Sequence, residues 1–156
     1  MSNPPLDSYD RKILALLQHD GRITNARLSE LVNLSPSACL ARHRRLEEAG
    51  VITGYRAEIS MERISSVIRV LLQIKLRRHL PEDFRHLEVL LRKDARVREA
   101  AEISGEMDYF AIVCVRDVVE LRSLIEQLTI DAPSIECVKS FVVMHPTKPF
   151  SGHLLD

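Results

Sequence analysis

Residues 34–50 read LSPSACLARHRRLEEAG, and this stretch decides the fold of the first part of the chain. Ser35 is a good helix N-cap, and Pro36 fits the first helical position, where its missing N–H costs nothing. Gly50 suits the left-handed backbone that ends many helices. The stretch therefore predicts one helix that begins at Pro36 and ends at Ala49.

Two shorter helices are expected before this one. Asp7 or Ser8 can cap the first, and Thr24 can cap the second, which ends in a tight turn just before Ser35. Two helices joined by so short a turn are typical of a helix-turn-helix. The residues that follow, VITGYRAEI at 51–59, predict a short strand or wing. Residues 1–60 are thus expected to form a winged helix-turn-helix domain.

Helical geometry separates two faces of the helix that begins at Pro36. Steps of three or four residues place one stripe toward the core, made of Cys39, His43, Leu46 and Gly50. The opposite face can enter a DNA major groove, where arginine binds guanine edges or phosphates and short side chains permit close approach. The predicted DNA-binding residues are Ser35, Ser37, Leu40, Ala41, Arg44 and Arg45, with Arg56 reaching phosphate from the wing.

The charged residues and the histidine of this helix also have ordinary structural interpretations. Arg44 and Arg45 can simply be solvated, although their place after a helix-turn-helix favours DNA contact. Arg42 lies near the inward stripe, so a structural ion pair is as good an explanation as DNA. His43 is interpreted as a neutral histidine at the edge of the core; a pH-dependent switch is the alternative.

Beyond a linker at 61–66, strands and helices alternate. Strands are expected at 67–76, 97–103, 109–115 and 135–144, and helices at 81–93 and after Asp117. The inward stripe of the second helix is predicted to be Val118, Leu121, Ile125 and Leu128. The order βαββαβ is the ferredoxin-like arrangement. The chain is therefore expected to be α+β, with its second domain at 67–156.

The loop SGEMD at 104–108 separates two of these strands and is a candidate ligand-binding site. Gly105 allows the backbone to approach a ligand closely. A carboxylate from Glu106 or Asp108 can pair with an ammonium group, and Met107 lies between them. The alternative is that Gly105 serves only the turn and that Asp108 is merely solvated.

Composition excludes several classes of protein. Hydrophobic residues make up 46% and charged residues 28%, which is typical of a folded domain. The 22 basic and 22 acidic residues balance, so positive charge is concentrated near residues 42–56 rather than abundant. The cysteines form no CxxC pair, no signal peptide or membrane-spanning run is recognised, and no metal or catalytic constellation is found. We expect a cytoplasmic protein that is not an enzyme and has no cofactor or metal.

Three segments together resemble the Lrp/AsnC family, the feast/famine regulators. They are LDSYDRKILALLQHDGR at 6–22, LSPSACLARHRRLEEAGVITGY at 34–55 and SGEMDYF at 104–110. The resemblance implies a winged helix-turn-helix joined to an amino-acid-sensing domain of ferredoxin-like fold. It also implies homodimers that assemble further, commonly into an octamer, and double-stranded DNA bent around that assembly.

The resemblance also implies site residues. It places the loop with Gly105, Glu106, Met107 and Asp108 at the effector pocket, and it ranks Asp108 above Glu106 as the acidic group. Phe141, Val142 and Val143 are similar to a second region that affects the effector response, although any half-buried strand shows the same alternation. An architectural DNA-binding protein without an effector remains the alternative function.

Overall fold

The chain folds into two compact units. The structure is a computed structural model that describes residues 5–60, 64, 66–148 and 152–154. One unit consists of Met1–Ile59 with Lys148–Asp156, and the other of Ser60–Thr147. Among the described tail residues, the backbone of His153 hydrogen-bonds to the Gln18 side-chain amide. Most of the expected linker, 61–63 and 65, lies outside the described residues.

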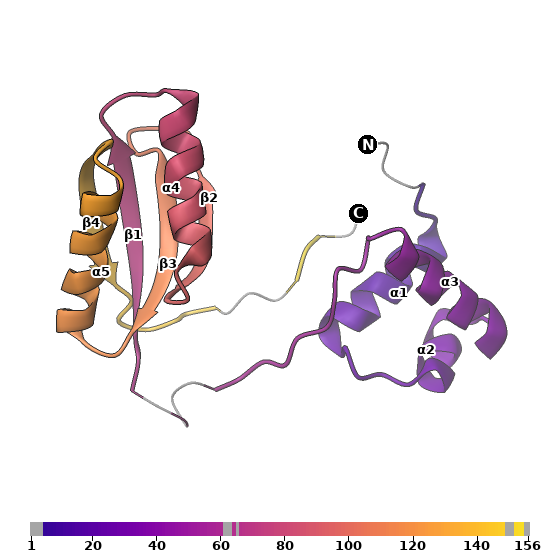
Figure 1. Cartoon of the computed structure of the whole chain (residues 1–156). Helices are drawn as coiled ribbons and strands as arrows, with labels where there is room; N and C mark the ends of the chain where they lie inside the picture. Colours follow the sequence, from indigo (N-terminus) through magenta and orange to yellow (C-terminus); the bar gives the residue numbers. More distant parts are fainter. Residues whose placement is uncertain (1–4, 61–63, 65, 149–151, 155–156) are drawn as a thin grey trace. The chain divides into compact units, whose positions relative to one another are not determined.

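The first unit contains the three expected helices, α1 (Ser8–His19), α2 (Asn25–Val32) and α3 (Pro36–Glu48) (Figure 1). Each is capped by an oxygen-bearing side chain, from Asp7, Thr24 and Ser35 respectively. Asn33 adopts a left-handed conformation between α2 and α3, and Gly50 does so after α3. The helix-turn-helix predicted from these caps is confirmed.

The wing expected at 51–59 is not a strand. These residues belong to no sheet, because a strand needs a neighbour for its backbone groups and this unit supplies none. The N–H groups of Val51 and Ile52 instead donate to the Leu46 carbonyl and close the end of α3.

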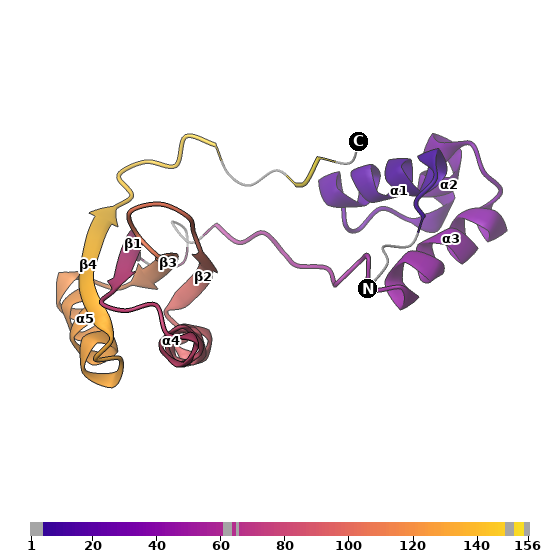
Figure 2. The ribbon, with the colours of Figure 1, turned by 90° about the horizontal axis from the view of Figure 1, so that it is seen from above.

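The second unit is a two-layer α+β structure. Its strands are β1 (Ile68–Leu76), β2 (Val97–Glu102), β3 (Tyr109–Val115) and β4 (Ile135–Val142), and its helices are α4 (Pro81–Lys93) and α5 (Val118–Asp131). The antiparallel sheet has the order β2-β3-β1-β4. Both helices cover the same face of the sheet (Figures 1 and 2). This is the expected ferredoxin-like arrangement. No helix in the described ranges is long and apolar enough to cross a membrane.

The inward stripe of α5 differs from the predicted one because it includes Leu124 and leaves out Val118. Leu121 and Leu128 are buried as expected, but Leu124 is completely buried while Val118 is 66% exposed. Leu124 and Val118 lie three residues to either side of Leu121, so spacing alone allows either one to extend the stripe. Packing against the sheet selects Leu124, which joins the core with Val70, Leu72 and Val113.

We predict that Leu124→Ala lowers the free energy of unfolding by about 2–5 kcal/mol, because it leaves a cavity in the core of the second unit. Val118→Ala is the matched control on the same helix, and its effect should stay within about 0.5 kcal/mol. Urea denaturation of the full chain measures both. Equal losses at the two positions would contradict this packing of α5.

Candidate nucleic-acid interface and ligand-binding loop

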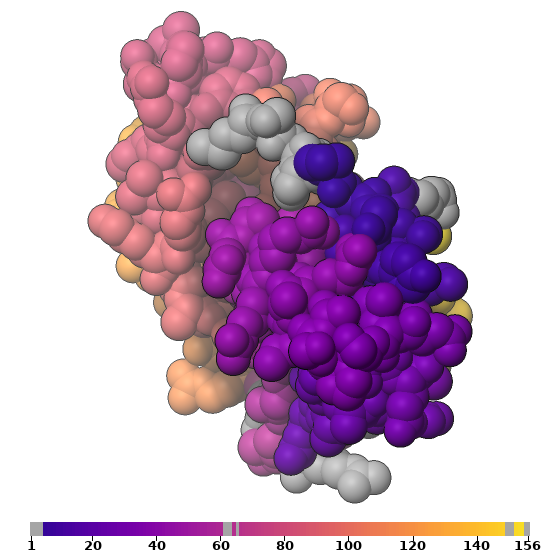
Figure 3. Space-filling model, turned by 90° about the vertical axis from the view of Figure 1, so that its right-hand side faces the viewer, coloured from indigo at the N-terminus to yellow at the C-terminus, as the bar shows by residue number. Residues whose placement is uncertain are grey.

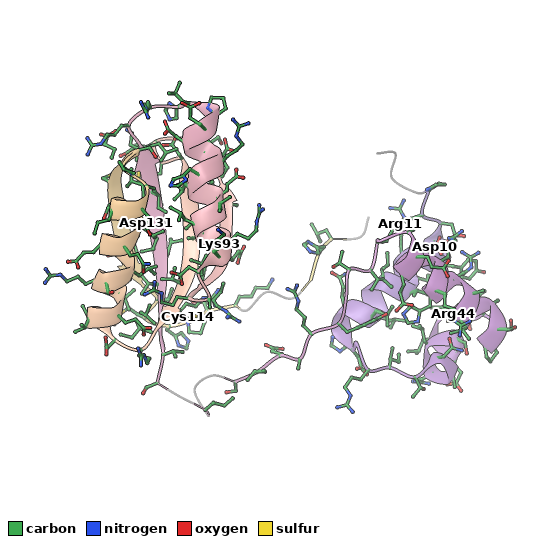
Figure 4. The ribbon with its side chains drawn as sticks, in the orientation of Figure 1. Asp10, Arg11, Arg44, Lys93, Cys114 and Asp131 are labelled. Atoms are coloured by element: carbon green, nitrogen blue, oxygen red, sulfur yellow. The ribbon has the colours of Figure 1, made fainter. Side chains whose placement is uncertain are left out.

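The exposed face of α3 carries most of the predicted DNA-binding residues. Ser37, Leu40, Ala41 and Arg44 all lie toward solvent, opposite the buried Cys39 and Leu46. Figure 3 shows one side of this unit, on which residues of the helix-turn-helix form the surface. Arg44, labelled in Figure 4, has no hydrogen-bond or ion-pair partner among the described residues. Its guanidinium is available to a ligand.

Ser35 and Arg56 lie beside this face. The Ser35 hydroxyl accepts from the Ala38 N–H at 3.2 Å and lies 3.2 Å from the Ser37 hydroxyl. It therefore serves first as the cap of α3. Arg56 is exposed in the segment that follows the helix, again with no partner among the described residues.

Arg45 and Arg42 form ion pairs with Asp10, a residue that was not predicted to belong to the site. Arg45 Nη2 lies 2.6 Å from Asp10 Oδ2, and Arg42 Nη1 lies 3.0 Å from Asp10 Oδ1. Arg42 also contacts Asp7 Oδ2 at 2.6 Å, and its guanidinium lies over the Tyr9 ring. The ion-pair interpretation of Arg42 is therefore confirmed. The hydrogen bond from the Asp10 N–H and then the contact with Arg42 lower the pKa of Asp7.

The other side of α3 contacts the segment after it through Tyr55. The Tyr55 hydroxyl donates to Glu47 Oε1 at 3.0 Å and accepts from His43 Nε2. Burial, with a further contribution from Glu47, raises the pKa of Tyr55 to about 12, so the hydroxyl keeps its proton near neutral pH. His43 lies at the edge of the core, as expected, but it also has a specific partner. The contact of Tyr55 with α3 is not predicted from the sequence, because residues 51–59 were expected to form a strand.

In the second unit, Asp108 is fully engaged by the fold. Its Oδ2 accepts from the Leu76 N–H at 2.7 Å, and its Oδ1 lies 2.8 Å from His79 Nε2. Its backbone N–H donates to the Ile74 carbonyl. The two carboxylate oxygens thus fasten the loop to the end of β1 and to His79 just after it, so Asp108 is neither merely solvated nor free for a ligand.

The rest of the loop remains accessible except for Met107, which is buried. Gly105 has a φ of +127°, a conformation that favours glycine. Glu106 is exposed, and its Oε1 lies 3.0 Å from Lys139 Nζ. The Lys139 contact, helped by Lys75, lowers the pKa of Glu106, so its carboxylate is charged at neutral pH. Within the described residues, no N–H from Ser104 to Met107 donates to a backbone carbonyl.

The structure does not bring Phe141, Val142 and Val143 to this loop. Phe141 pairs with Leu71 on β1, whereas Asp108 contacts Leu76. Five residues of extended strand separate these positions, which is about 16 Å along β1. The two predicted halves of the effector site therefore lie toward opposite ends of that strand within one chain.

Comparisons with known proteins agree with this arrangement of two units. The winged helix-turn-helix DNA-binding family matches residues 6–53, and the Lrp/AsnC ligand binding domain matches residues 69–152. These matches cover α1 to α3 and all of the sheet except Ile68, the first residue of β1. The presence of a ligand-binding domain disfavours the architectural alternative, a DNA-binding protein without an effector.

Individual relatives match almost the whole chain. The leucine-responsive regulatory protein of Haemophilus influenzae is 36% identical over 94% of this chain and 88% of its own length. A transcriptional regulator from Neisseria meningitidis, solved in complex with L-Met, has a TM-score of 0.88 at 29% identity, covering 97% of this chain and 98% of its own. An AsnC family regulator from Agrobacterium tumefaciens has a TM-score of 0.86 at 28% identity, over 96% of both chains. The chain therefore belongs to the Lrp/AsnC family and is a ligand-sensing, DNA-binding transcriptional regulator.

Proposed function

We propose that α3 reads double-stranded DNA in the major groove, with Arg44 contacting a base edge. The observation that carries this proposal is the combination of a free Arg44 guanidinium and the small residues Ser37 and Ala41 on one exposed helix face. Small residues allow the helix backbone to approach the bases, and arginine binds guanine through two hydrogen bonds. Leu40 shares this face and offers an apolar contact to a base methyl group, whereas Ser35, Arg45 and Arg56 border the face and contact phosphate. The setting is the cytoplasm, where the DNA lies.

We propose further that the second unit binds an α-amino acid at the loop 104–108. Such a ligand needs an acceptor for its ammonium group and donors for its carboxylate. The charged Glu106 supplies the acceptor, whereas Lys139 and the N–H groups around Gly105 supply donors. A relative was solved in complex with L-Met, which supports this ligand class. Asp108 holds the loop in place, so we assign Glu106, rather than Asp108, as the acceptor for the ammonium group.

The helix-free face of the sheet supports assembly into homodimers. Phe141, Leu71 and Ile112 are paired across β4, β1 and β3, so they form an apolar row on one face. Their neighbours Val70 and Leu72 point to the helices, so this row lies on the uncovered side. A sheet with one uncovered apolar face is stabilised when a second layer buries it. We propose that a second copy supplies this layer and that dimers assemble further, up to an octamer.

Removing the Arg44 guanidinium should weaken specific DNA binding. We predict that Arg44→Ala costs about 1–3 kcal/mol, or about 5- to 150-fold in affinity, for DNA that the protein selects from a random pool. Arg11→Ala removes the same charge from α1 and is the control. Fluorescence anisotropy titrations measure both. Unchanged affinity and unchanged preference over random DNA for Arg44→Ala would contradict the proposed reading face.

A charge placed on the apolar row should disrupt the dimer. We predict that Ile112→Glu lowers the molar mass measured by light scattering to that of a monomer, because the carboxylate would be buried without a partner. Ser123→Glu introduces the same charge on α5 and should leave the mass unchanged. If Ile112→Glu keeps the mass of the unaltered chain, the sheet face is not the interface.

A cognate amino acid should stabilise the native state. Binding at about 100 times the dissociation constant adds about 2.7 kcal/mol, which raises the melting midpoint. We predict that at least one of the twenty amino acids does so in a thermal-shift screen, and that Glu106→Gln abolishes the shift while Glu136→Gln retains it. Asp108→Ala should instead lower the midpoint without ligand. A full shift in Glu106→Gln would remove Glu106 from the site.

A further inference from the structure

The carboxylate of Asp10 is the one charged group of the first unit that is completely removed from water among the described residues. Its Oδ2 accepts from the Asp7 N–H at 3.1 Å and lies 2.6 Å from Arg45 Nη2, and its Oδ1 lies 3.0 Å from Arg42 Nη1. A buried carboxylate is strongly unfavourable unless it is paired in this way. Asp10 therefore links the first turn of α1 to two points on α3.

The positions of the two arginines restrain how α3 can rotate about its own axis. At 100° per residue, Arg42 and Arg45 lie on neighbouring lines of one flank, while Arg44 lies on the exposed face. A single contact would let the helix roll, whereas two contacts from one fixed carboxylate oppose rolling in both directions. The rotation of α3 about its axis determines the direction in which the Arg44 side chain points.

The opposite flank of α3 is restrained as well, through His43 and Glu47. Both contact the Tyr55 hydroxyl, and the Tyr55 ring lies beside Gly21, where an added Cβ would meet it at 3.5 Å. The face with Ser37, Ala41 and Arg44 lies between these two polar contacts. The orientation of this face is therefore fixed by polar contacts on both flanks of α3, and not by the apolar core alone.

We propose that Asp10 is a positioning residue for DNA recognition. By holding Arg42 and Arg45 it sets the roll of α3 and points Arg44 at the bases. It also keeps Arg45, whose side chain is 57% exposed, turned toward the flank, where its remaining N–H groups reach a phosphate rather than a base edge. This inference rests on the proposed reading of DNA by α3.

The test is Asp10→Asn in the full chain, which keeps the shape of the side chain but removes its charge. Affinity is measured for DNA selected by the protein and for random duplex of the same length, at a temperature where circular dichroism shows both proteins folded. We expect the ratio of the two affinities to fall by about 5- to 150-fold, the effect of losing one base contact. Asp20→Asn removes the same charge at the other end of α1 and should leave the ratio unchanged.

A second variant covers the case in which Asp10→Asn does not fold. Arg42→Lys keeps the positive charge, but one ammonium cannot reproduce the forked contact with Asp7 and Asp10. Arg42 is not a proposed DNA contact, so a fall in the affinity ratio for this variant reports positioning. An unchanged ratio in whichever variants fold would overturn the inference. If Arg44→Ala still lowers the ratio, the proposed reading of DNA by α3 stands, and only the positioning role of Asp10 is wrong. If Arg44→Ala has no effect either, the proposed reading of DNA by α3 is wrong as well.

Discussion

A carboxylate that is buried away from water needs hydrogen-bond donors from the protein itself. Asp10 on α1 finds them in Arg42 and Arg45 of α3, and so joins the two helices. The apolar core of the first unit is small, built around Ile13, Leu28, Val32 and Leu46. Apolar contacts are not directional, so such a core leaves the rotation of a short helix weakly determined. The directional ion pairs of Asp10 with Arg42 and Arg45 determine that rotation. The exposed face of α3 is thus defined by polar contacts at its flanks as much as by burial beneath it.

The second unit has a comparable constraint at the loop 104–108, the proposed ligand-binding loop. Asp108 fastens the loop to the end of β1, and this leaves Gly105 and Glu106 exposed on a fixed base. A rigid support of this kind keeps donors and acceptors in place before a ligand arrives, which lowers the entropic cost of binding. Asp108, the carboxylate that the sequence favours for ligand binding, therefore supports the loop, and Glu106 is the acidic group that we propose for the ligand.

Local signals predicted most of the fold, and contacts distant in sequence account for the rest. Caps at Asp7, Thr24 and Ser35 placed three helices, and alternation placed the four strands. The partners of Asp10 lie 32 and 35 residues away, and those of Asp108 lie 29 and 32 away. No periodicity encodes such pairings. The same limit explains the choice of Leu124 over Val118 and the missing strand at 51–59, since a strand depends on a partner that local sequence does not reveal.

Because the chain is a ligand-sensing regulator, we infer that a ligand bound in one unit changes how the other unit binds DNA. Such coupling requires that the ligand have different affinities for the free and DNA-bound states. The most direct test is a titration of the full chain against its selected DNA, with and without a saturating amino acid identified by thermal shift. We expect the dissociation constant for DNA to change by about 5- to 150-fold, the usual range of allosteric coupling. An identical constant in both titrations would contradict it.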